Sequence, residues 1–129
     1  MTTSPTPDQN PTFFDRLRGL FGGGSGDGSL GSTVTADRAL ELVTGGATLV
    51  DVRESSEWKS GHAPRAVHIP LGQINSGARR LPKGRPVVVV CASGMRSRTA
   101  AKQLRSLGYD AASLSGGMPA WQRAGGEVR

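Results

Sequence analysis

The pattern of apolar and polar positions predicts strands alternating with helices from about residue 33 onward. Four consecutive valines at 87–90 form an apolar run that is typical of a strand buried on both faces. After them, alanines and leucines between residues 100 and 107 recur at the spacing of a helix with one apolar face. Strands are expected at 34, 48–53, 66–70, 87–91 and 111–114, and helices at 36–43, 54–60, 72–81, 99–107 and 119–124.

This alternation favours an α/β fold with a central, mostly parallel sheet and helices on both faces. Thr35 is expected to cap the helix at 36–43, and the glycines at 45 and 46 are expected to end it. In such folds small ligands bind outside the carboxyl ends of the strands. The residues that follow the strand at 87–91 are therefore the first candidates for a functional site.

Residues 1–32 are expected to be a flexible tail that precedes a domain at 33–129, because they hold much of the glycine, serine, threonine and proline. Within the tail, residues 13–21 are amphipathic, since two phenylalanines and two leucines fall on one helical face. A flexible Gly/Ser linker follows at 22–29. The segment at 13–21 could dock a partner or touch a membrane surface, or it could be an incidental apolar patch.

The chain is basic, with 16 Lys and Arg against 10 Asp and Glu and a formal net charge of +6. No run of cations exceeds two residues and few aromatic residues lie among them, so we expect a solvated basic surface and no nucleic-acid-binding module. A local excess at Arg96, Arg98 and Lys102 suits a small anionic substrate. The sequence has no signal-peptide pattern and no apolar run near the roughly 20 residues of a membrane-spanning helix.

The only cysteine, Cys91, stands where the predicted central strand runs into a loop and then a helix. A single cysteine excludes an internal disulfide and a multi-cysteine metal site, and is typical of the reducing cytoplasm. Backbone N–H groups and the positive end of a helix dipole would stabilise a thiolate there and lower its pKa from about 8.5. Alternatively, Cys91 is a small buried core residue. Its position alone favours neither interpretation.

Six segments, taken in order over about residues 33–129, resemble the rhodanese family of sulfurtransferases and imply a single rhodanese-like domain. They are Val50-Asp51-Val52-Arg53-Glu54, Glu57-Trp58, Gly61-His62-Ala63-Pro64, Ala66 through Ile69-Pro70, Cys91-Ala92-Ser93-Gly94-Met95-Arg96-Ser97 and Gly116-Gly117-Met118-Pro119-Ala120-Trp121. Two positions depart from the family pattern, since Arg65 replaces the usual glycine and Ala63 a larger aliphatic residue. We expect both departures to affect local packing rather than chemistry.

The resemblance implies a thiosulfate sulfurtransferase that needs no cofactor. Cys91 would take the sulfane sulfur of a small anionic donor, such as thiosulfate, as a persulfide, and would pass it to a thiol, cyanide or protein acceptor. Gly94 would let the loop curl, Arg96 would hold the anionic leaving group, and Ser97 would cap the helix and donate to the sulfur. The whole substrate-binding loop would comprise Ala92, Ser93, Gly94, Met95, Arg96 and Ser97, with Ser93 as a second donor and Met95 in an apolar rim.

Two alternatives to this activity stand beside it. The first is a phosphatase or arsenate reductase, which also uses a cysteine, a loop and an arginine. Rhodanese-like phosphatases have one residue more between these two than the four found here, and a histidine before the cysteine where this chain has Val90. The second alternative is a non-catalytic binding or sulfur-sensing module that keeps the cysteine.

Asp51 and Arg53 are expected to support the site. Asp51 would either bond to the cysteine loop or cap the turn that follows it, and Arg53 is predicted to pair with Glu57, four residues further on. His62 is expected to be a structural hydrogen-bonding residue, and His68 a packing or surface residue. Two histidines and one cysteine without ligand spacing predict no metal site. We further expect a cytoplasmic monomer that has no nucleic-acid partner.

Overall fold

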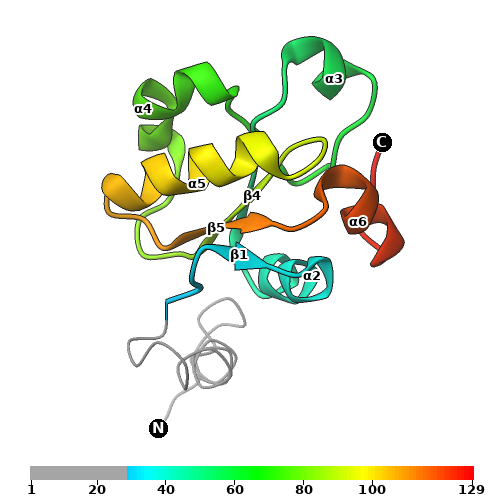
Figure 1. Ribbon diagram of the computed structural model, residues 1–129, viewed down its shortest axis with the longest axis horizontal. Coiled ribbons are helices and arrows are strands. Elements are labelled where there is room, and N and C mark those ends of the chain that lie inside the picture. Colours follow the sequence, from blue (N-terminus) through cyan, green and yellow to red (C-terminus); the bar gives the residue numbers. More distant parts are fainter. Residues whose placement is uncertain (1–28) are drawn as a thin grey trace, which may run out of the picture.

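Five parallel strands form the centre of the structure, a computed structural model that describes residues 29–129. The strands are β1 (Thr33–Val34), β2 (Thr48–Asp51), β3 (Val67–His68), β4 (Val87–Val90) and β5 (Ala111–Leu114), in the spatial order β1-β5-β4-β2-β3. Every neighbouring pair is parallel, and β4 lies in the middle of the sheet (Figure 1). The amphipathic segment predicted at 13–21, and all of the predicted linker except Ser29, lie outside the described residues.

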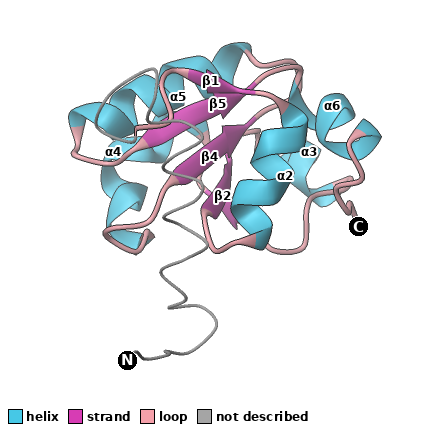
Figure 2. Cartoon of the chain, turned by 90° about the horizontal axis from the view of Figure 1, so that it is seen from below, coloured by secondary structure: helices cyan, strands magenta, loops and turns pink. Residues whose placement is uncertain are grey.

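Helices cover both faces of the sheet, as predicted (Figure 2). They are α2 (Ala36–Thr44), α3 (Ser55–Lys59), α4 (Ile74–Gly77), α5 (Met95–Ser106) and α6 (Gly117–Arg123), with 3-10 turns η2 (Leu71–Gln73) and η3 (Ala78–Arg80) on either side of α4. The α/β fold is therefore confirmed. Across residues 29–129, no helix is long and apolar enough to cross a membrane.

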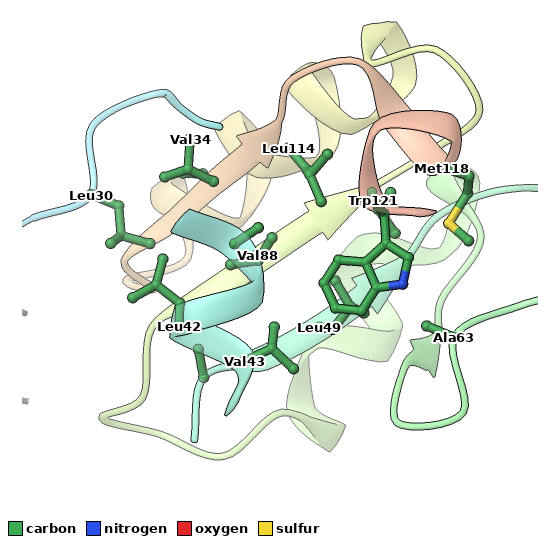
Figure 3. Close-up of a cluster of buried hydrophobic side chains, with 14 residues drawn as sticks. Leu30, Val34, Leu42, Val43, Leu49, Ala63, Val88, Leu114, Met118 and Trp121 are labelled. Atoms are coloured by element: carbon green, nitrogen blue, oxygen red, sulfur yellow. The ribbon is translucent and has the colours of Figure 1, made fainter. Parts of the chain in front are cut away.

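The side chains of β4 enter two separate hydrophobic cores, one on each side of the sheet, because successive side chains of a strand point to opposite sides. Val88 packs in a cluster with Leu42 of α2 and Trp121 of α6 (Figure 3). Val89 packs on the other side with Leu104 of α5 and with residues of α4 and η3. All four valines of β4 are at most 1% exposed, which explains why this strand is apolar throughout instead of alternating. Leu30 belongs to the first cluster, so packing begins before β1.

The helix that follows the cysteine begins earlier than predicted, at Met95 instead of residue 99. Gly94 immediately before it has a φ of 109°, in the left-handed region that only glycine adopts without strain. This conformation turns the chain directly from the loop into the helix. Arg96 and Ser97, which were expected in the loop, therefore lie in the first turn of α5, and Gly94 rather than Ser97 stands at the cap position.

The other helices differ less from their prediction. The Thr35 cap is confirmed, since its hydroxyl oxygen accepts a hydrogen bond from the Arg38 N–H at 3.2 Å. The helix expected at 72–81 is instead one α-turn between two 3-10 turns, in a segment where two glycines disfavour a longer helix. Leu107, expected on an apolar helix face, is 42% exposed because α5 ends one residue before it.

Gly117 joins β5 and α6 to the cysteine loop through close backbone packing. Its φ is 64°, and a Cβ at this position would lie 2.3 Å from the carbonyl oxygen of Ala92. The next residue, Met118, donates its N–H to the carbonyl oxygen of Cys91 at 2.9 Å. A glycine here therefore lets α6 support the base of the loop directly.

We expect Gly117→Ala to lower the free energy of unfolding by about 3 kcal/mol, because the new methyl group collides with the Ala92 backbone in a left-handed conformation. Gly108→Ala is the matched control, since its φ is 97° but a Cβ there meets nothing within 4 Å. The control should lose only about 1 kcal/mol. Urea unfolding measures both losses, and equal losses would contradict this account of the packing.

Candidate active site

Cys91 directly follows the carboxyl end of β4 and is completely buried. Its Sγ accepts hydrogen bonds from the backbone N–H groups of Gly94, at 3.0 Å, and Ser97, at 3.3 Å. The Ser97 hydroxyl oxygen lies 3.4 Å from the same sulfur. The loop and the first turn of α5 thus direct three polar groups at one atom.

These contacts determine the pKa of the Cys91 thiol. Burial is the largest single effect and raises the pKa, because it disfavours the charged thiolate. The hydrogen bond with the Ser97 hydroxyl and those from the backbone N–H groups of Ser97, Gly94 and Ser93 act in the opposite direction and together outweigh burial. The pKa of the thiol is therefore lowered from its ordinary value although the side chain lies in the core. The side chain is thus buried, as one interpretation of the sequence expected, and its pKa shifts in the direction that the other expected.

Ser113 of β5 is a buried residue behind the thiol that was not identified from the sequence. Its hydroxyl oxygen lies 2.7 Å from that of Ser97, so Cys91, Ser97 and Ser113 form a continuous chain of polar contacts. Ser113 is fully buried, and it pairs in register with Val89. One polar residue within an otherwise apolar strand is the only sequence signal for it, and that signal does not indicate a partner.

Arg96 is held by an ion pair with Glu57 of α3. The two terminal guanidinium nitrogens, Nη1 and Nη2, donate to the Glu57 carboxylate, at 2.7 and 2.9 Å. Each of the two side chains is 33% exposed. Glu57 also accepts the Glu54 N–H at 2.9 Å, in the capping box of α3. Arg96 above all lowers the pKa of Glu57 to about 2, and Glu57 raises the pKa of Arg96. This link joins α3 to the first turn of α5.

The predicted pair of Arg53 with Glu57 is wrong. Arg53 is buried and pairs with Asp51 instead, with its Nη2 at 2.8 Å and its Nε at 3.0 and 3.1 Å from the carboxylate oxygens. Asp51 is fully buried at the end of β2, and a buried carboxylate requires a cationic partner, which the turn after β2 brings back to it. Glu57 lies beyond this turn on α3, where Arg96 reaches it.

Asp51 acts as the cap of its own turn, the second of the two roles considered for it. Its Oδ1 accepts the backbone N–H of Arg53 at 3.0 Å, and its observed side-chain bonds go to Arg53 rather than to the cysteine loop. Arg53 extends further to the carbonyl oxygen of Gly61 at 2.7 Å. Because Asp51 is in register with Val90, the pair supports the end of the sheet beside Cys91.

Both histidines stack on the Trp58 ring, with centroid distances of 3.5 Å for His62 and 4.6 Å for His68. His62 Nδ1 lies 2.7 Å from the carbonyl oxygen of Trp58, and His68 Nε2 lies 2.8 Å from that of Arg53. Each histidine therefore forms a hydrogen bond with a backbone carbonyl group, which is the structural role expected of His62. No group of three potential metal ligands occurs among residues 29–129.

The side chains of Ala92, Ser93 and Met95 make no observed hydrogen bond to the Cys91 sulfur. Ala92 is half-buried and Ser93 is exposed. Met95, expected in an apolar rim, is 74% exposed at the start of α5. Arg98 and Lys102 are exposed further along α5, whereas Arg96, the second residue of the helix, is half-buried.

Comparison with known proteins identifies the family to which this chain is similar. The family model of the rhodanese-like domain matches residues 35–124. The crystal structure of a rhodanese-related protein from Thermoplasma volcanium superimposes with a TM-score of 0.68 at 28% identity, covering 76% of this chain and 97% of that one.

Two curated relatives are named for sulfur transfer. YtwF of Bacillus subtilis (strain 168), provisionally named a sulfurtransferase, is 42% identical over 74 residues, which is 57% of this chain and 72% of YtwF. MoeZ of Mycobacterium tuberculosis (strain ATCC 25618 / H37Rv), named a probable adenylyltransferase/sulfurtransferase, is 32% identical over 115 residues. That match covers 85% of this chain but only 29% of the length of MoeZ.

We expect Ser97→Ala to raise the pKa of the Cys91 thiol, because the variant loses the hydroxyl that counteracts burial most strongly. Ultraviolet absorbance of the thiolate, followed against pH, measures this shift, and the chain has one cysteine, so the signal has a single source. Thr99→Ala, which removes an exposed hydroxyl two residues further along α5, is the control and should leave the titration unchanged. An unshifted titration in Ser97→Ala would contradict the proposed role of the hydroxyl.

Proposed function

The chain belongs to the rhodanese-like domain family, and on that premise we propose that it is a sulfurtransferase in which Cys91 carries the sulfur as a persulfide. The names of the curated relatives support sulfur transfer at the level of the family. One observation carries the assignment to Cys91. Two backbone N–H groups and one hydroxyl meet at its Sγ and favour the thiolate, which is the nucleophilic form of the side chain.

In the first half of the reaction, the Cys91 thiolate attacks the outer sulfur of thiosulfate. The new bond joins Sγ to that sulfur, the sulfur–sulfur bond of thiosulfate breaks, and sulfite leaves with the electron pair. The cysteine becomes a persulfide anion, and no oxidant or reductant is consumed. The N–H groups of Gly94 and Ser97 stabilise the charge on the sulfur, and the Arg96 guanidinium holds the departing anion.

In the second half, a thiophilic acceptor attacks the outer sulfur of the persulfide. The Sγ–S bond breaks, its electron pair returns to Cys91, and the thiolate is regenerated. Cyanide would leave as thiocyanate and a thiolate would leave as a persulfide. A thiol that must stay reduced between cycles fits a reducing compartment, which supports a cytoplasmic location.

We expect the full-length protein to gain the mass of one sulfur atom when it is incubated with thiosulfate, and to release it on addition of cyanide. Intact-protein mass spectrometry measures the gain, and thiocyanate formation measures turnover. Cys91→Ser should abolish both, because the hydroxyl is not ionised at neutral pH. The proposal is wrong if the wild type gains no sulfur from thiosulfate, polysulfide or a cysteine-desulfurase persulfide. Hydrolysis of an aryl phosphate without sulfur gain would instead identify a phosphatase.

Substitutions of Arg96 and Glu57 should have opposite effects on the thiosulfate concentration that the protein needs for loading. We expect Arg96→Gln to raise the thiosulfate concentration needed for half-maximal loading about tenfold, the loss of one charge-assisted hydrogen bond. Glu57→Gln should lower that concentration, because the carboxylate both occupies Arg96 and repels an anionic donor. Arg85→Gln is the control, because it removes a cation at the opposite end of β4, and it should leave that concentration unchanged. Equal effects of the Arg96 and Glu57 variants would indicate a purely structural pair.

A further inference from the structure

The cations and anions of this chain are segregated along the sequence. No Asp or Glu lies between Glu57 and Asp110, whereas ten Lys or Arg lie there. The interval contains α4, η3 and α5, which together cover one face of the sheet. The helix α2 on the opposite face carries Asp37 and Glu41. The fold therefore converts a bias along the sequence into one helical layer without acidic residues.

We use the name basic face for four exposed cations of this layer. They are Arg79 and Arg80 of η3 together with Arg98 and Lys102 of α5. The two elements share a core beneath them, and α4 lies beside α5 on the same side of the sheet (Figure 1). The layer contains no carboxylate that could neutralise these four charges, so its electrostatic potential favours anions.

The basic face also includes an exposed apolar side chain next to the catalytic loop. Among the described residues, Met95 and Leu107 are the exposed large hydrophobic side chains, and they lie at the two ends of α5. Met95, Arg98 and Lys102 are spaced three and four residues apart, so they share one outward stripe of the helix. Methionine is enriched where proteins meet, and exposed cations form a polar rim around such contacts.

We propose that the basic face, with Met95, is the docking surface for an acidic protein whose cysteine exchanges sulfur with Cys91. The proposal rests on the persulfide chemistry above and identifies the partner of that same site. Met95 stands four residues after Cys91, so a protein lying on this stripe presents its own thiol at the loop. Its thiolate attacks the outer sulfur of the persulfide, the Sγ–S bond breaks, and the electron pair returns to Cys91.

A protein partner fits this surface better than a nucleic acid. Proteins that bind single-stranded nucleic acids stack bases on exposed aromatic rings. The aromatic side chains of the described residues, Trp58, Tyr109 and Trp121, are buried or half-buried, and none belongs to the basic face. In addition, only a partner with a thiol can continue the reaction at Cys91.

Two designed acceptors test the proposal: a peptide with one cysteine beside a run of glutamates, and the same peptide with glutamines in their place. The full-length protein is first loaded with thiosulfate, and transfer of sulfur to each peptide is followed by mass spectrometry. We expect transfer to the acidic peptide to be about tenfold faster at low ionic strength, and this preference to disappear in high salt. The double variant Arg98→Glu with Lys102→Glu should lose the preference while its transfer to the neutral peptide stays unchanged.

The control reverses two exposed charges away from the face, Arg85→Glu with Arg123→Glu, and should keep the preference. Loading with thiosulfate separates the two proposals. A protein that does not load contradicts the sulfurtransferase function itself. A protein that loads but transfers equally to both peptides, or whose preference survives reversal at 98 and 102, overturns only the docking surface. Tight binding of a single-stranded RNA homopolymer that is lost in the same double variant would also overturn it.

Discussion

The arrangement of the site depends on one feature: polar groups converge on a sulfur atom that is buried at the end of a central strand. Burial alone would raise the pKa of the Cys91 thiol. The short turn at Gly94 starts α5 at once, so that the Ser97 hydroxyl and backbone N–H groups of the loop and of the first helical turn meet at the sulfur and lower its pKa. The backbone N–H groups among these contacts are positioned by the path of the chain.

The neighbouring elements hold that path in place. Gly117 allows the backbone of α6 to lie against Ala92, and Met118 donates to the carbonyl oxygen of Cys91. On the other side, Glu57 of α3 holds Arg96 in the first turn of α5. The loop is thus held by segments that precede and follow it in the sequence, although it occupies only a few residues.

The two arginine–carboxylate pairs differ in burial, and this difference separates their roles. Asp51 and Arg53 are enclosed, satisfy each other and hold the end of β2. Such a pair is difficult to exchange, because freeing either charge would leave the other unpaired in the interior. Glu57 and Arg96 are a third exposed, so water and incoming anions reach them. Arg96 is therefore accessible to solvent ions, whereas Arg53 is enclosed with its partner.

The sequence by itself determined the alternation of strands and helices, the place of Cys91 after the central strand, and the family, because each follows from local periodicity or from contiguous motifs. It did not determine which charges pair: Arg53 and Glu57 have helical spacing, but Arg53 turns back to a buried carboxylate while Glu57 meets a residue 39 positions away. Ser113 behind the thiol and the acid-free helical layer also come from the tertiary structure. Contacts of this kind depend on which strands lie side by side and which face each helix covers, and no local pattern records either.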